Sequence, residues 1–262
     1  MMSIIKNEGI AISTVKKLEI GLSEEKILSL IKTSLNDGLK AWNDRIPELL
    51  NTFADEIDKK IREIDESKRN DNVNVRNIMQ AVDNAKWCIE EAEVRRMFAN
   101  LIAAEHNTDK VTSLASSFPD IIRQLSREDA IILNLFSDKA YFGTIPMISV
   151  RDVFSMSGSY YLRGYVRLSS EAQQKELEKK ILFVEDSLAN FERLGLIKVA
   201  DSMVAGVSEF DRDCEWLERN ITKINEYKEF SEMARGSGAF SIFRESFSYT
   251  PFGLNFVRSC VL

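Results

Sequence analysis

The chain has 262 residues, of which 44% are hydrophobic and 29% are charged, and its 35 basic and 41 acidic side chains give a formal net charge of −6. This composition is typical of a globular protein with one large or two modest domains, and it excludes a short peptide or a disordered tail. With only 4 prolines and 11 glycines, the chain is too poor in turn residues for a β sandwich or barrel, so we expect a largely helical protein.

Two amphipathic helices are predicted before residue 67. Ser23, followed by two glutamates and an apolar run, is typical of a helix N-cap, and the sequence NDG at residues 36–38 is typical of a helix end. A second, longer helix is predicted from apolar residues at spacings of three and four, namely Ile46, Leu50, Phe53, Ile57, Ile61 and Ile64. The polar residues 67–74 then predict a loop.

Further helices are predicted up to residue 137. The apolar pattern of residues 75–105 changes phase near residues 88–90, which predicts two packed helices with a break between them. Pro119 is expected in the first turn of a short helix. Ser126 and Asp129 have the spacing of a capping box and predict the start of a helix over residues 130–137.

The C-terminal half has a different pattern. A short helix is predicted at residues 150–156, and a longer one over residues 177–191, where apolar residues are spaced four, three, four and three. Two strands are predicted at residues 196–199 and 247–249, and a last short helix at residues 251–261.

This order of elements predicts the fold class. We expect a mainly α protein, in which a helical bundle (residues 1–125) precedes a winged-helix-like α+β domain (residues 126–262). A helix at about residues 207–235 is inserted in the predicted wing. Its apolar residues form a narrow seam, Phe210, Cys214, Leu217, Ile221 and Ile224, which predicts packing within the chain or, alternatively, across a homodimer.

No membrane segment is expected. The charge-free stretch at residues 140–150 is far shorter than the ~20 apolar residues that a membrane span needs. The first residues carry no signal-peptide pattern, so a cytoplasmic location is expected. Cys88, Cys214 and Cys260 lie far apart in apolar helical patterns and are interpreted as reduced core residues.

Four segments carry a family resemblance. They are EVRRMFANLIAA (residues 93–104), SFPDIIRQLS (117–126), AIIL (130–133) and YTPFGLNFV (249–257). Together they resemble the abortive infection alpha family of bacterial proteins, and the likeness is strongest over residues 75–135. The resemblance implies a bacterial or prophage-encoded protein tied to defence against phage, and it assigns no catalytic residue. The same apolar positions are also what any buried helix needs.

The sequence offers few reactive groups. His106 is the only histidine, so a catalytic triad with histidine and a multi-histidine metal site are excluded. The sequence GSG at residues 236–238 lacks the rest of a phosphate-binding loop. We expect neither enzymatic activity nor a cofactor, although a magnesium site built only from carboxylates stays open as an alternative.

The best cluster for nucleic-acid binding lies in the middle of the predicted winged helix. It consists of Arg151, Arg163 and Arg167 with Tyr160, Tyr161 and Tyr165. An exposed polar face with half-buried tyrosines is the alternative interpretation of these residues. The helix before Gly195 exposes three acids, Glu185, Asp186 and Glu192, against one base, which repels phosphate.

These observations support a preferred function and an alternative. The preferred hypothesis is a non-enzymatic cytoplasmic protein that acts in phage defence through contacts with a phage or host protein. The alternative is a DNA-binding winged-helix regulator that uses the three arginines. Self-association through the seam is a third possibility.

Overall fold

The computed structural model describes residues 46–137, 144–152, 161–167, 181–200, 208–223, 225–234 and 240–262, together with Lys26, Ser29, Lys32 and Thr33. The chain forms two compact units. The first comprises Met1–Ile131 and Asn255–Leu262, and the second comprises Ile132–Leu254. None of the described helices combines the length and the apolar character that crossing a membrane demands.

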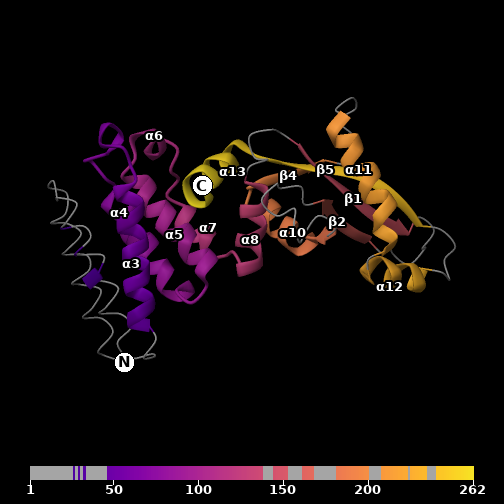
Figure 1. Ribbon diagram of the computed structural model, residues 1–262, viewed down its shortest axis with the longest axis horizontal. Helices are drawn as coiled ribbons and strands as arrows, with labels where there is room; N and C mark the ends of the chain where they lie inside the picture. The colour runs from indigo at the N-terminus through magenta and orange to yellow at the C-terminus, as the bar shows by residue number, and fades with distance from the viewer. Residues whose placement is uncertain are drawn as a thin grey trace. The chain divides into compact units, whose positions relative to one another are not determined.

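The first unit is a bundle of helices (Figure 1). Its elements are α3 (Ile46–Arg62), α4 (Val75–Ala85), α5 (Ala92–Glu105), α6 (Thr108–Val111), α7 (Phe118–Ile122) and the beginning of α8 (Arg127–Phe136). The predicted break is confirmed, because α4 ends in a 3₁₀ turn, Lys86–Cys88, before α5 starts. Leu50, Phe53, Ile57 and Ile61 of the predicted apolar stripe are buried in α3, as the spacing predicts.

Local signals also account for other parts of this unit. The capping box is confirmed, since the Ser126 amide donates to Asp129 Oδ2 at 3.0 Å and the Asp129 amide donates to Ser126 Oγ at 3.0 Å. Of the helix predicted after Ser23, the positions described by the structure are helical, and the remaining residues lie outside the described ones.

The C-terminal segment belongs to the first unit. It consists of the end of α13 (Pro251–Phe256) and a π-helical turn, η6 (Val257–Val261). Phe256 packs edge-on against Phe118 with ring centroids 5.2 Å apart, and Asn100 Nδ2 donates to the carbonyls of Cys260 and Val261 at 3.0 and 3.1 Å. These contacts explain why the units differ from the expected domains 1–125 and 126–262, which placed this segment in the second domain.

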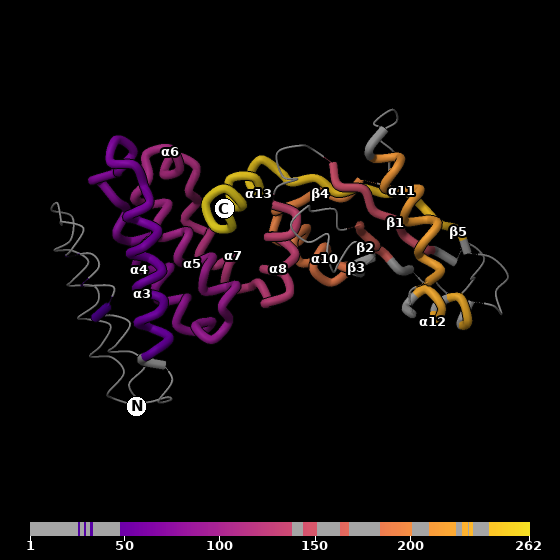
Figure 2. Tube along the Cα trace, viewed as in Figure 1, coloured from indigo at the N-terminus to yellow at the C-terminus, as the bar shows by residue number. Residues whose placement is uncertain are grey.

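The second unit is built on an antiparallel sheet (Figures 1 and 2). Its five described strands are β1 (Thr144–Asp152), β2 (Tyr161–Arg167), β3 (Ile181–Phe183), β4 (Ile197–Ala200) and β5 (Phe240–Tyr249), in the order β3-β2-β1-β5-β4. The helices α10 (Glu185–Arg193), α11 (Ser208–Asn220) and α12 (Asn225–Ala234) accompany them, together with the end of α8 and the start of α13. The strands predicted at residues 196–199 and 247–249 are confirmed, and they pair with each other.

Two helix predictions in this unit are wrong in their described first residues, although α10 confirms the later part of the long helix. Residues 150–152 belong to β1, and residues 181–183 of the predicted long helix form β3, so helix starts only at Glu185. Residues 153–156 and 177–180 of these predictions lie outside the described ones. The predicted inserted helix is in fact two helices, α11 and α12, with a 3₁₀ turn at Ile221–Lys223.

The structure supports a mainly helical protein with an antiparallel sheet in its C-terminal half. It does not identify the second unit as a winged helix, because β1, β2 and β3 extend the sheet beyond the two predicted strands. We missed β1 because its side chains from Ile145 to Val150 are buried on both faces of the sheet. A strand of this kind has no alternation of polar and apolar residues to distinguish it from helix.

Candidate functional site

The sheet of the second unit carries charged side chains on both faces, and these form the candidate site. One face is covered by α11, and we call it the α11 face. Ile148, Val150 and Tyr165 of the sheet are fully buried there with Leu217 and Ile221. Because successive residues of a strand point to opposite faces, the residues next to these three along the strands point to the opposite face.

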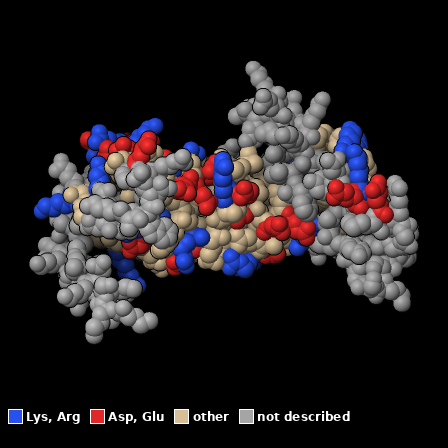
Figure 3. All heavy atoms as spheres, turned by 90° about the horizontal axis from the view of Figure 1, so that it is seen from below, with Lys and Arg blue, Asp and Glu red and all other residues tan. Residues whose placement is uncertain are grey.

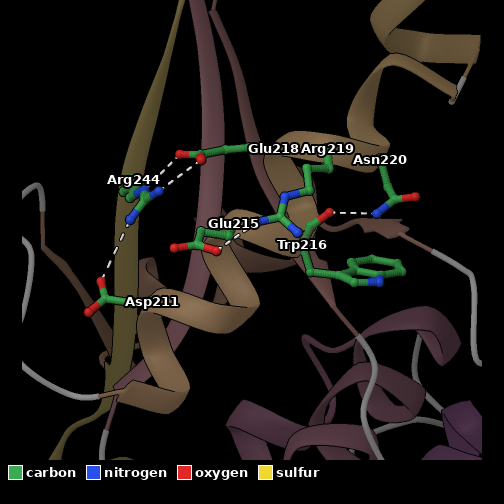
Figure 4. A network of polar contacts seen from close by, with 7 residues as sticks. All are labelled: Asp211, Glu215, Trp216, Glu218, Arg219, Asn220 and Arg244. Atoms are coloured by element: carbon green, nitrogen blue, oxygen red, sulfur yellow. Dashed lines mark hydrogen bonds and ion pairs between the residues drawn. The ribbon is translucent and has the colours of Figure 1, made fainter.

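Arg244 of β5 joins the α11 face to α11 (Figure 4). Its guanidinium donates from Nε to Glu218 Oε1 at 2.6 Å and from Nη2 to Glu218 Oε2 at 2.8 Å, and Asp211 lies 3.6 Å away. This forked pairing is the geometry in which arginine binds a carboxylate most strongly. It raises the pKa of Arg244 further above its usual range, so Arg244 keeps its positive charge.

Arg167 of β2 is held on the same face by a second acid and a ring. Its Nη1 donates to Asp213 Oδ1 at 2.9 Å, and Asp213 is only 7% exposed. The guanidinium also lies 4.6 Å from the centroid of the Trp216 ring, within reach of a cation–π interaction. Two strands thus each present an arginine to α11, and α11 supplies a carboxylate to each.

The opposite face holds a buried polar cluster of Glu245, Ser149 and Arg163. Glu245 is 1% exposed, and its Oε2 accepts from Ser149 Oγ at 2.6 Å and from Arg163 Nε at 3.2 Å. These residues come from the central strands β5 and β1 and from β2. A carboxylate with so little exposure needs such donors, since an uncompensated buried charge is costly.

A β-bulge places Arg163 on this opposite face. Ile148 pairs with Tyr165 but Val150 pairs with Leu162, so β2 contains one residue more than β1 over this interval. Gly164 lies in the bulge with φ of +96°, a value that favours glycine. The extra residue turns Arg163 away from the α11 face and toward Glu245.

Glu185, at the start of α10, lies beside this bulge. Burial raises the pKa of its carboxyl group, and a hydrogen bond from the Arg163 amide acts in the opposite direction. The amide of Val184 donates to the carbonyl of Gly164 at 3.0 Å, which ties the start of α10 to the bulge.

The predicted arginines are not brought together on one face. Arg163 faces Glu245, whereas Arg167 faces α11, and each makes an ion pair with a carboxylate. Arg151 lies in β1 as the register partner of Tyr161 in β2. Tyr165 is fully buried on the α11 face, where it is not available for stacking on a base. Tyr160 lies outside the described residues.

The predicted seam is buried inside the second unit. Phe210, Cys214, Leu217 and Ile221 are at most 4% exposed, and the last two pack on the sheet. Burial raises the pKa of the Cys214 thiol to about 12, which keeps it protonated. Packing within the chain therefore accounts for the burial of these four residues. Ile224 lies outside the described residues.

Sequence reasoning missed Glu245, Ser149, Arg244 and Glu218. The signal that could have found two of them is the pair Arg244–Glu245, which interrupts a strand of aromatic and aliphatic residues. Their partners lie far away along the chain, up to 96 residues for Ser149 and Glu245, so no local spacing predicts the pairs.

The arrangement consists of arginine–carboxylate pairs that neutralise each other. Within the described ranges, no three histidine, cysteine, aspartate or glutamate side chains are grouped so as to hold a metal ion. These pairs supply fixed charges and hydrogen bonds that hold the strands to one another and to α11.

Comparison with known proteins places the chain in a family. The family described as abortive infection alpha matches residues 47–260. No curated protein matches the chain. A solved structure of an uncharacterized protein from the marine bacterium Alcanivorax borkumensis SK2 has 16% sequence identity and a TM-score of 0.33, with 57% of this chain and 92% of that chain covered. Because the family match spans most of its length, this chain belongs to the abortive infection alpha family.

Proposed function

We propose that this protein acts in abortive infection as a non-enzymatic protein that works through contacts with a protein partner. Family membership supports the association with abortive infection. One structural observation favours a protein partner over nucleic acid: Arg163, Arg167 and Arg244 are each bound to a carboxylate of the same unit. An arginine in such a pair has to give up its partner before it can bind a phosphate.

The surface charges support the same proposal. The outer positions of α10 include the exposed acids Asp186 and Glu192, and its one basic residue, Arg193, donates to Asn190 at 2.7 Å. On the face shown in Figure 3, basic and acidic side chains of the described residues occur in small mixed groups. Mixed charge with an acidic helix suits a basic protein surface better than a polyanion.

A phage plating assay with charge-reversal variants tests the proposal. Cells that produce the wild-type protein are expected to reduce plaque formation by a susceptible phage. The double variant Asp186→Lys and Glu192→Lys should lose at least tenfold of this protection, because it reverses the charge of α10. The matched control is Glu229→Lys with Glu232→Lys on α12, which changes two exposed acids of the same unit and should keep protection.

Three results would contradict the proposal. The first is the absence of protection by the wild-type protein at confirmed expression. The second is hydrolysis of nucleic acid or nucleotide by the purified protein that disappears when a single carboxylate is neutralised. The third is salt-dependent binding of duplex DNA that Arg163→Ala and Arg167→Ala both weaken, which would favour the DNA-binding winged-helix alternative.

A further inference from the structure

A small pocket in the first unit has the properties of an anion site. It opens to solvent, has a volume of about 110 Å³ and is lined mainly by polar atoms. Lys60 of α3 and Lys110 of α6 both line it, together with Asn100, Asn107, Glu63 and Leu262. Two cationic side chains from different helices therefore converge on one hollow.

These two lysines differ from others in the same unit. Lys59, Lys68 and Lys86 each form an ion pair with a carboxylate, at 3.9, 2.7 and 2.7 Å. Within the described part of the chain, the side-chain amines of Lys60 and Lys110 form no ion pair and no hydrogen bond. Glu63, an acid that lines the pocket, pairs with Lys59, and its charge also raises the pKa of Lys60.

The pocket is unfavourable for its own charges when it holds no anion. Burial lowers the pKa of Lys110; Cys260 opposes this effect, and the charges of Lys60 and Arg258 add to it. Burial also lowers the pKa of Lys60, and Arg96 adds to this effect although Glu63 and Glu56 oppose it. Partly buried like charges destabilise each other, and a bound anion relieves this repulsion.

The pocket is built on fixed groups. Asn100 is 8% exposed, and its Nδ2 donates to the carbonyls of Cys260 and Val261, which anchors η6 beside α5. Asn107 Oδ1 accepts from the Asp109 amide at 2.9 Å, which orients this side-chain amide and keeps its nitrogen available as a donor.

We propose that this pocket binds a phosphate-type oxyanion, with Lys60 and Lys110 as the charged ligands and Asn107 as a neutral donor. The oxyanion is free phosphate or the phosphate group of a larger ligand. A volume of about 110 Å³ suits one such group, since pockets for whole drug-sized ligands are about 300–1,000 Å³. This site is independent of the function proposed above, because it lies in the other unit and involves none of the same residues.

Calorimetric titration of the full chain tests the site with two probes, inorganic phosphate and AMP, at constant ionic strength set with sodium chloride. Lys60→Gln and Lys110→Gln should each weaken binding at least tenfold. Lys198→Gln, which removes an equal charge from an exposed strand position of the second unit, should leave binding unchanged. Glu63→Gln should tighten binding, because it removes a negative charge from the pocket.

Thermal unfolding without phosphate separates binding from folding. The two pocket variants should be at least as stable as the wild type, because each removes an unpaired, partly buried charge. Saturating phosphate should raise the melting temperature of the wild type but not of these variants. Tighter binding of AMP than of phosphate identifies a phosphate ester as the ligand, and the reverse identifies the free ion. Absence of binding by both probes, or equal weakening in Lys198→Gln, overturns the proposal.

Discussion

His106 shows at the scale of one residue how burial controls charge. It is 5% exposed, its Nε2 has no hydrogen-bond partner in the described part of the chain, and burial lowers its pKa to about 4. Its neighbour Glu105 is also buried, where Asn77 Nδ2 donates to Glu105 Oε1 at 2.9 Å. Both residues lie at the end of α5 and hold the loop that precedes α4.

Because of His106, the stability of the folded protein is expected to decrease as the pH decreases. Its pKa is about 4 in the folded protein against a reference value of 6.5, so between these values the unfolded chain binds a proton that the folded chain does not. At pH 5 this difference should lower the free energy of unfolding by about 2 kcal/mol relative to pH 7. Urea unfolding at several pH values measures it, and His106→Gln should remove this part of the slope.

Glu105 provides an opposing contribution to the same curve. Burial raises its pKa, so the folded state takes up a proton at a higher pH than the unfolded chain, and this stabilises the fold as the pH falls. The comparison between the wild type and His106→Gln cancels the contribution of Glu105. An identical pH slope in both proteins would show that His106 is not buried in the neutral form.

At the scale of elements, the contacts of residues 249–257 explain why Thr250 and Gly253 occur in this segment. Thr250 Oγ1 donates to the carbonyl of Gly195 at 2.7 Å and accepts from the Gly253 amide at 2.9 Å, which docks the start of α13 beside β4. A Cβ at Gly253 would collide with the carbonyl oxygen of Leu196. Glycine is therefore required here by close backbone approach rather than by a special backbone angle.

Gly253→Ala should be destabilising by about 3 kcal/mol, because the carbonyl of Leu196 is backbone and has little freedom to shift. Gly195→Ala is the control. Gly195 has φ of +73° with no atom within 4 Å of the added Cβ, so it should lose only the cost of a left-handed residue, about 1–2 kcal/mol. Urea unfolding of both variants measures the two costs, and the reverse order would contradict this packing.

At the scale of the whole molecule, the burial of the seam indicates whether the chain associates with a second copy through it. Leu217 is fully buried between α11 and the sheet, and Phe210, Cys214 and Ile221 are buried with it. A second copy could reach these side chains only if α11 left the sheet. We therefore expect the seam to stabilise one chain rather than a dimer.

Leu217→Ala should lower the free energy of unfolding by about 2–4 kcal/mol through the cavity that it creates. The melting temperatures of the wild type and the variant should not depend on protein concentration, as expected when no subunit interface is lost on unfolding. Light scattering should give the same mass for both proteins. A mass that falls from dimer to monomer in the variant would instead support the homodimer alternative.

Local patterns predicted much of the first unit. The stripe of α3, the break after α4 and the capping box of Ser126 and Asp129 each depend on residues within one or two helical turns. The sheet was predicted only in part, because β1 is buried on both faces and β2 contains a bulge. Residues 181–183 have apolar residues at helical spacing but form β3, because pairing with β2 outweighs their local helix preference.

Composition, short spacings and contiguous motifs are enough to predict the charge balance, most helices of the first unit and the family. The same local patterns point to Arg163 and Arg167. What these arginines do depends on long-range packing, since their partners Glu245 and Asp213 lie 82 and 46 residues away. The same holds for Lys60 and Lys110, whose shared pocket exists only because helices distant in sequence pack together.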